Sequence, residues 1–278
     1  MKKLVIEGGH KISGTIKISG AKNSIVALIP ASILTNGKCV ITNVPDISDV
    51  RILIEMMQEL GSIINFENDT ITIDNKNVKN KKITEEYASK LRASYYFMGS
   101  LVGKYHNAEI AYPGGCVIGS RPIDYHIKSF KKMGIDIESD GDEFKMKTDH
   151  LKGEYFYLDF PSVGATINIM LASTLAEGKT IIENAAKEPE IANVASFLNS
   201  MGASIFGAGT SRIEINGVKN LGDGFVEVIP DRIEAGTYML IGALIGENLV
   251  LENIVENHLE ALLDKLRESG VNYEIKDN

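Results

Sequence analysis

The sequence predicts an α/β protein built by repetition of one unit of about 70 residues. Four segments read as strand, turn, helix, glycine and strand, and they open with GKCVIT, NAEIAY, GKTIIE and GENLVLE. The helix-ending glycines recur at intervals of 73, 68 and 68 residues: Gly61, Gly134, Gly202 and Gly270. Glycine at such a position adopts the left-handed conformation that ends a helix. Strands and helices in this order are typical of layered α/β proteins.

Each unit is expected to contain two kinds of helix. Ahead of each strand lies a stretch with apolar residues on every side, which predicts a buried helix: SIVALIPASILTNG, SYYFMGSLVGKY, TINIMLASTLAEG and EAGTYMLIGALIGEN. The helix after each strand, such as ISDVRILIEMMQELG, has a charged face and is expected to cover a sheet. Short alternating runs at 70–73 and 212–215 supply further strands.

Composition excludes several classes of protein. The net charge of −8 argues against a nucleic-acid binder, and 44% hydrophobic with 24% charged residues is ordinary for a globular protein. The start, MKKLVIEGGHKISG, has no apolar run of signal-peptide length, and acidic and amide residues interrupt the longest apolar stretch. Cys39 and Cys116 lie in no CxxC or histidine-rich context, so we expect neither disulfide nor metal. A cytoplasmic protein that does not bind membranes is predicted.

The second repeat differs from the others in a glycine-rich loop that holds a cysteine. From strand end to helix-ending glycine it spans 21 residues, against 17 or 18 elsewhere, and the excess falls in Pro113–Arg121. The flanking glycines favour an exposed loop, and Arg121 would favour a thiolate at Cys116 or an anionic ligand. The alternative is that Cys116 is a small buried residue. Cys39, in the strand KCVIT, is expected in the core.

Three cations stand at predicted helix starts. Lys22 lies in the first turn of a predicted helix, where a positive charge is unfavourable because of the helix dipole unless an anion is bound. Arg92 occupies the matching position of the second repeat. Arg121 precedes Pro122, a good first-turn residue. Helix starts with adjacent cations bind phosphate, so a phosphate- or carboxylate-bearing substrate is indicated. Chance placement on the surface is the alternative.

The corresponding helix starts of the third and fourth repeats are each compatible with more than one role. Ser162, Val163 and Gly164 carry no cation, and they would either hold a second anionic group or a base edge, or provide an ordinary N-cap. The stretch 231–237 would form a site, an interdomain contact or a cap.

Several motifs then resemble one family along the whole chain. They are GAKN (20–23), LRAS (91–94), PGGC-x-IG-x-RP-x-D-x-H (113–126), SVGAT (162–166), EGKTIIENAAKEPEI (177–191) and PDRIEAGTY (230–238). In order and content they resemble the UDP-N-acetylglucosamine 1-carboxyvinyltransferases. The sister shikimate enolpyruvyl transferases are similar only in repeat architecture, because they lack the PGGC loop.

The resemblance implies a particular domain organisation. It implies inside-out α/β barrel domains of three repeats each, with the active site between two of them. Residues 22–229 would form one complete domain, and 1–21 together with 230–278 an incomplete second one. Family members run to about six repeats, so the sequence resembles a C-terminally shortened member, whose incomplete domain would self-associate. A proposed general-base carboxylate and a further arginine would lie beyond residue 278.

The resemblance also implies a reaction and roles for the motif residues. The enolpyruvyl group of phosphoenolpyruvate would pass to UDP-N-acetylglucosamine with release of phosphate, the first committed step of peptidoglycan synthesis, without cofactor or metal. Cys116 would donate a proton, and Lys22 and Arg121 would take part in catalysis. The substrate-binding residues implied are Lys22, Asn23, Arg92, Arg121, Pro122, Ile123, Asp124, Tyr125, Ser162, Val163 and Gly164. The alternatives are a non-catalytic UDP-sugar-binding fragment and a shikimate-type enolpyruvyl transferase.

Overall fold

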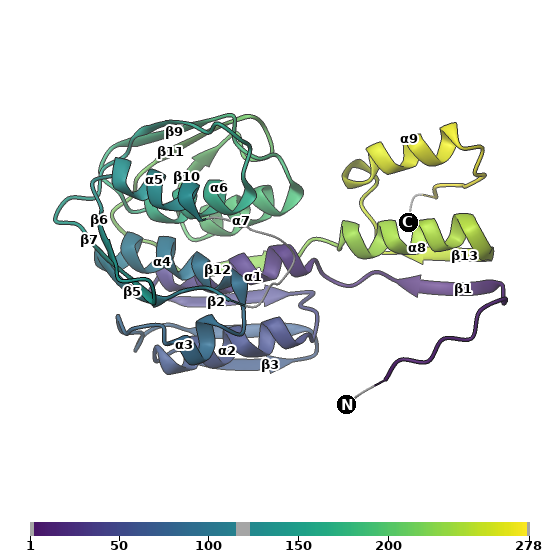
Figure 1. Cartoon of the computed structure of the whole chain (residues 1–278), viewed down its shortest axis with the longest axis horizontal. Coiled ribbons are helices and arrows are strands. Elements are labelled where there is room, and N and C mark those ends of the chain that lie inside the picture. The colour runs from purple at the N-terminus through teal and green to yellow at the C-terminus, as the bar shows by residue number, and fades with distance from the viewer. Residues whose placement is uncertain (1–2, 115–122, 277–278) are drawn as a thin grey trace. The chain divides into compact units, whose positions relative to one another are not determined.

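The computed structural model describes residues 3–114 and 123–276, and these fall into two compact units. One unit comprises residues 22–229, and the other combines residues 1–21 with 230–278 (Figure 1). Within the described residues no helix is long and apolar enough to cross a membrane.

The larger unit contains three repeats in chain order. The first consists of α1 (Lys22–Ala31), η1 (Ser32–Leu34), β2 (Lys38–Thr42), α2 (Ser48–Glu59), β3 (Ile63–Glu67) and β4 (Thr70–Asp74). The second consists of α3 (Glu85–Ala88), η2 (Arg92–Tyr95), α4 (Tyr96–Tyr105), β5 (Asn107–Ala111), α5 (Asp124–Lys132), β6 (Asp136–Ser139) and β7 (Glu143–Lys147). The third consists of β8 (Tyr155–Tyr157), α6 (Val163–Ser173), β9 (Lys179–Glu183), α7 (Pro189–Ser200), β10 (Ser204–Phe206) and β11 (Arg212–Asn216), and β12 (Gly224–Glu227) follows it.

Apolar helices form the centre of this unit and strands lie outside them (Figure 1). Residues 24–31 of α1, 96–103 of α4 and 165–173 of α6 are all buried, as their apolar sequences predict. Gly99 allows α4 and α6 to approach closely, because a Cβ there would lie 2.5 Å from Oδ1 of Asn168. The helices are therefore inside and the sheets outside, which is the inside-out arrangement expected.

The strands of this unit form open sheets. Their orders are β12-β2-β4-β3, β5-β7-β6 and β10-β11-β9-β8, and in the described residues none closes on itself into a barrel. Within each sheet the repeat supplies an antiparallel set, as in the pairing of β2 with β4 and of β9 with β11. β12 and β8 add parallel strands to β2 and β9.

The smaller unit contains the fourth repeat. Its elements are β1 (Ile12–Lys17), α8 (Arg232–Ile245), β13 (Gly246–Glu252), η3 (Glu256–His258) and α9 (Glu260–Glu268). β1 pairs with β13 in parallel, and a small core forms around Ile18, Ala235, Leu259 and Leu263.

The expectation that α8 is a buried helix like its three counterparts is wrong for this unit. Only Ala235 and Gly236 of α8 are buried, and the side chain of Leu244 is 83% exposed. The described part of the unit offers α8 a two-stranded sheet and one further α-helix, too few elements to cover an apolar helix on every side.

Left-handed residues mark equivalent points of the repeats. The helix-ending glycines all have positive φ, between 77° and 105°, which confirms the sequence interpretation. At the ends of three strands asparagine adopts the same conformation, with φ of 54° to 56°, and its amide donates to a carbonyl of the neighbouring segment. These pairs are Asn43 with Val228, Asn184 with Leu158, and Asn253 with Ile18, at 2.6–2.7 Å. The second repeat has Ala111 and Tyr112 at this place, where its longer loop begins.

Candidate functional site

Lys22 and Asn23 form the first turn of α1. The Nζ atom of Lys22 lies 2.9 Å from Oδ2 of Asp49 in the first turn of α2, and its side chain is about half exposed. Asn23 is exposed. The carboxylate of Asp49 supplies negative charge to Lys22, so the position of this lysine at a helix start does not by itself require a bound anion.

Arg92 is the first residue of η2. The first residues of the PGGC loop are hydrogen-bonded to the segment just before it. The N–H of Gly114 donates to the carbonyl of Ala88 at 2.9 Å, four residues before Arg92. A Cβ at Gly114 would lie 2.5 Å from the carbonyl oxygen of Ser89, so only glycine fits this close passage. Cys116, Arg121 and Pro122 lie outside the described residues.

The chain is described again at Ile123, which is buried, and α5 follows from Asp124. Asp124 is exposed in the first turn of α5, where a carboxylate favours the helix dipole. Tyr125 is half-buried. His126, in the first turn of α5, is buried.

His126 connects α5 to η2 and α6. Its ring lies 4.8 Å from the ring of Tyr95, between centroids, and its Nδ1 lies 2.7 Å from Nδ2 of Asn168. The histidine is 6% exposed. Its Cε1–Nε2 edge packs against Gly164, where a Cβ would come within 2.9 Å of Cε1. A larger residue at position 164 would therefore displace the imidazole.

Burial, with a smaller contribution from the positive charge of Arg92, lowers the pKa of His126 to about 4. The imidazole is thus neutral at neutral pH. Arg92 lies in the same turn as Tyr95, whose ring contacts His126, so Arg92, His126 and Gly164 belong to one neighbourhood.

Ser162 is the N-cap of α6. Its Oγ accepts a hydrogen bond from the N–H of Ala165 at 3.3 Å, which matches the capping alternative. Val163 and Gly164 form the first helical turn, whose N–H groups have no partner inside the helix. Any anion at this helix start would be bound by these amides and by the side chains around them.

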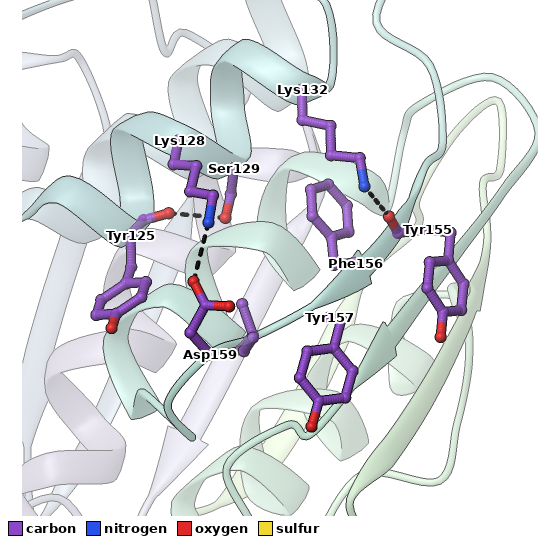
Figure 2. A pocket seen from close by; sticks show the side chains of 9 residues that line it. Tyr125, Lys128, Ser129, Lys132, Tyr155, Phe156, Tyr157 and Asp159 are labelled. Carbon is purple, nitrogen blue, oxygen red and sulfur yellow. Dashed lines mark hydrogen bonds and ion pairs between the residues drawn. The ribbon is translucent and has the colours of Figure 1, made fainter.

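Tyr125 also lines a separate pocket of about 210 Å³ between α5 and β8 (Figure 2). Its cations are engaged with neighbouring groups. Nζ of Lys128 lies 2.9 Å from Oδ2 of Asp159, and Nζ of Lys132 donates to the carbonyl of Tyr155 while lying over the ring of Phe156. Of the predicted site residues that the structure describes, this pocket includes Tyr125 alone, so those residues do not gather there.

Asp231, whose role the sequence left open, is the N-cap of α8. Its Oδ1 accepts from the N–H groups of Ile233 and Glu234 at 2.8 and 3.1 Å. Oε2 of Glu234 in turn accepts from the N–H of Ser19 at 3.0 Å.

Cys39 is fully buried, and burial raises the pKa of its thiol to about 12. Its Sγ lies 3.8 Å from Sδ of Met201. Among the residues that the structure describes, no group of three His, Cys, Asp or Glu side chains is placed to hold a metal ion.

The structure therefore brings together three of the predicted segments: the Arg92 turn, the start of α5 and the start of α6. Lys22 lies at the start of α1 with Asp49. Sequence reasoning assigned no role to His126, Tyr95 or Asn168, which connect the three segments. The one sequence signal for His126 was its position as the last residue of the PGGC motif. Its contact with Asn168 could not be predicted from neighbouring residues, because the two are 42 residues apart in sequence.

A comparison with known families identifies the family that shares this repeat architecture. Residues 6–278 match the family described as EPSP synthase (3-phosphoshikimate 1-carboxyvinyltransferase), and the chain belongs to that family.

Within the family, the chain is similar to enzymes of one substrate class. It is 50% identical over 278 residues to UDP-N-acetylglucosamine 1-carboxyvinyltransferase 2 of Bacillus subtilis (strain 168), covering 100% of this chain. It is also 50% identical over 273 residues to the enzyme of the same name from Staphylococcus aureus (strain N315), covering 98% of this chain. The chain spans 65% of the length of these curated relatives.

Solved structures share the fold at lower identity. The enolpyruvyl transferase NikO from Streptomyces tendae matches with a TM-score of 0.87 and 22% identity, over 98% of this chain and 66% of that one. EPSP synthase from Acinetobacter baumannii matches with a TM-score of 0.72 and 20% identity, over 95% of this chain and 60% of that one.

Proposed function

We propose that the protein transfers the enolpyruvyl group of phosphoenolpyruvate to UDP-N-acetylglucosamine, with release of phosphate, as the first committed step of peptidoglycan synthesis in the cytoplasm. The observation that carries this proposal is the 50% identity over the whole chain to enzymes named for this transfer. The PGGC loop, which begins beside the Arg92 turn, supports it further.

In the proposed reaction a hydroxyl group of the sugar gives up its proton to a base and its oxygen forms a bond to the central carbon of phosphoenolpyruvate, while the methylene carbon takes up a proton. The carbon–oxygen bond to phosphate then breaks, and a proton leaves the former methylene carbon to restore the double bond. Cys116 is the proposed proton donor. Lys22, Arg92 and Arg121 would stabilise the phosphate and the charge that develops on it.

The nucleotide sugar is proposed to bind along the starts of α5 and α6. Arg121, Pro122, Ile123, Asp124 and Tyr125 would contact its uridine and diphosphate on one side. On the other side the N–H groups of Val163 and Gly164, in the turn capped by Ser162, suit an anionic group. Asn23 would contact the sugar or the reacting centre.

Calorimetric titration tests the substrate class of this proposal. UDP-N-acetylglucosamine and shikimate 3-phosphate are titrated in parallel into the protein expressed from its natural gene. The proposal expects heat of binding with the first ligand and none with the second. Binding of shikimate 3-phosphate alone would favour the shikimate-type alternative. UDP-N-acetylglucosamine binding without phosphate release in a separate turnover assay would favour a non-catalytic sugar-nucleotide binder. Self-association through the incomplete second domain stays a separate prediction.

A further inference from the structure

Ser24 lies in the first turn of α1, directly after Lys22 and Asn23, and it is fully buried. Its Oγ donates to Oδ1 of Asn193 in α7 at 2.5 Å, across 169 residues of sequence. Asn193 is itself only 7% exposed. Water therefore has little access to this hydrogen bond, in contrast to the ion pair of Lys22, whose side chain is about half exposed.

The other contacts of Asn193 fix the orientation of its amide. Its Nδ2 donates to the carbonyl oxygen of Glu227 at 2.9 Å, and its Oδ1 accepts from the N–H of Ile229 at 3.4 Å. A flipped amide would place two acceptors together at Glu227 and two donors together at Ile229. Because Oδ1 therefore faces Ser24 as an acceptor, the serine hydroxyl must be the donor.

The segment that Asn193 contacts, residues 227–229, is itself held by the first repeat. The N–H of Val228 donates to the carbonyl of Thr42 at 3.0 Å, and the side-chain amide of Asn43 donates to the carbonyl of Val228 at 2.7 Å. Val228 is fully buried. Asn193 thus connects the first turn of α1 to a fixed segment at the end of β12.

The first turn of a helix is one of its least constrained parts. Its N–H groups have no partner within the helix, and helix ends open without unfolding of the remaining structure. In α1 this turn carries two of the predicted site residues, Lys22 and Asn23. A buried side-chain contact from the same turn therefore restricts the positions of both.

We infer that Asn193 is a positioning residue: through Ser24 it holds the first turn of α1, and with it Lys22 and Asn23, in the orientation that meets phosphoenolpyruvate. The identity of this ligand rests on the proposed function, whereas the holding of the turn does not. Loss of the hydrogen bond would loosen Lys22 and Asn23 without removing either side chain. It should weaken the use of phosphoenolpyruvate more than the binding of UDP-N-acetylglucosamine, whose main proposed contacts lie at α5 and α6.

Hydrogen exchange without ligand tests the holding of the turn. In an α-helix each N–H donates to the carbonyl four residues earlier, so the N–H groups of Val26 and Ala27 pair with the first two residues of α1 and are exposed when that turn opens. Ser24→Ala should increase the exchange rates of Val26 and Ala27 about tenfold relative to that of Ile29, which pairs further along the helix. Equal acceleration at Ile29, or no acceleration, would overturn the holding role.

Ser62→Ala is a matched control for Ser24→Ala. Ser62 also donates to Oδ1 of a buried asparagine, Asn75, at 2.7 Å, and Asn75 likewise donates to a backbone carbonyl, that of Ser32. None of these three is a predicted site residue. Ser62→Ala should neither speed exchange selectively at Val26 and Ala27 nor change the use of phosphoenolpyruvate.

Steady-state kinetics tests the link to the reaction. Ser24→Ala should lower kcat/KM for phosphoenolpyruvate about fivefold and Asn193→Leu at least as much, while the Kd of UDP-N-acetylglucosamine stays within about twofold of wild type. The double variant should lose no more than Asn193→Leu alone, because both changes remove one hydrogen bond. Asn193→Asp keeps an acceptor toward Ser24 and should recover most of the wild-type value. Unchanged kinetics in Ser24→Ala, additive losses in the double variant, or equal losses in Asn193→Asp and Asn193→Leu would contradict the inference.

The two measurements separate this inference from the proposed function. If wild-type protein releases no phosphate from phosphoenolpyruvate in the presence of UDP-N-acetylglucosamine, the proposed function falls, and the link to the reaction falls with it. The exchange rates of Val26 and Ala27 in Ser24→Ala then still decide whether Asn193 holds the first turn of α1.

Discussion

Nζ of Lys22 and Oδ2 of Asp49 lie 2.9 Å apart, joining the first turns of two helices of the first repeat. If Lys22 also binds the phosphate of phosphoenolpyruvate, Asp49 competes with that ligand. We predict that Asp49→Asn strengthens phosphoenolpyruvate binding by a few-fold, because a half-exposed ion pair is worth only about 1 kcal/mol or less.

Calorimetric titration with phosphoenolpyruvate checks this, with Asp46→Asn as control, since Asp46 pairs instead with Arg51. The gain should vanish in the double variant with Lys22→Ala. An equal gain in that double variant would mean that Asp49 acts without Lys22.

The two cysteines should differ sharply in reactivity. Cys39 is buried, with the pKa of its thiol raised to about 12, so almost no thiolate is present at pH 8. We predict that limited treatment with iodoacetamide, followed by peptide mapping, labels Cys116 and spares Cys39. Cys116→Ser should then leave the folded protein unlabelled. Labelling of both thiols at one rate would remove the case for a special thiol at Cys116.

Acid should destabilise the protein through His126. An unfolded histidine takes up a proton near pH 6.5, whereas burial holds the pKa of native His126 at about 4. The unfolded state therefore binds more protons between these values, and stability falls as pH drops from about 6.5 toward 4. From pH 7 to 4.5 this group should remove about 2 to 3 kcal/mol of unfolding free energy.

Urea unfolding at the two pH values measures this loss. His126→Gln should be less sensitive to acid than wild type by that amount, and His150→Gln, which removes an exposed histidine, should not. The same acid loss in His126→Gln would show that other groups cause it.

The left-handed asparagines should each stabilise a repeat in two separable ways. Asn184→Gly keeps the positive φ but loses the hydrogen bond to Leu158, at a cost of about 1 kcal/mol. Asn184→Ala also places an unsuited side chain in the left-handed region, which adds about 1 kcal/mol. In urea unfolding, the free energy of unfolding should be highest for wild type, lower for Asn184→Gly and lowest for Asn184→Ala. Equal stability of the Gly and Ala variants would show that the conformation at 184 imposes no strain.

Local pattern was sufficient to predict most of the secondary structure. The glycine that ends each helix and the alternating runs that became β4 and β11 depend on neighbours within a few residues. Strand partners were not predictable in this way. β12 pairs with β2 across more than 180 residues, and nothing in GFVE distinguishes that partner from a nearer one. Tertiary packing alone decides it.

The candidate site was predictable only in part, for a similar reason. Residue type and helix position suggested Arg92 and Ser162 as site residues, and the family resemblance added Asp124. A buried contact such as that of His126 with Asn168 has no periodic signal. The helix-dipole argument for a bound anion at Lys22 was incomplete, because the carboxylate of Asp49 on the next helix balances the charge of this lysine. A sequence shows an uncompensated charge but not its partner in space.

Phosphate release is the most direct measure of enolpyruvyl transfer to a nucleotide sugar. The protein, as its own gene encodes it, is mixed with phosphoenolpyruvate and with UDP-N-acetylglucosamine, shikimate 3-phosphate or no acceptor, and inorganic phosphate is followed over time. We expect release with UDP-N-acetylglucosamine as the only effective acceptor, matched mole for mole by its enolpyruvyl ether, and loss of release in Cys116→Ala. Release with shikimate 3-phosphate, or none with UDP-N-acetylglucosamine, would contradict it.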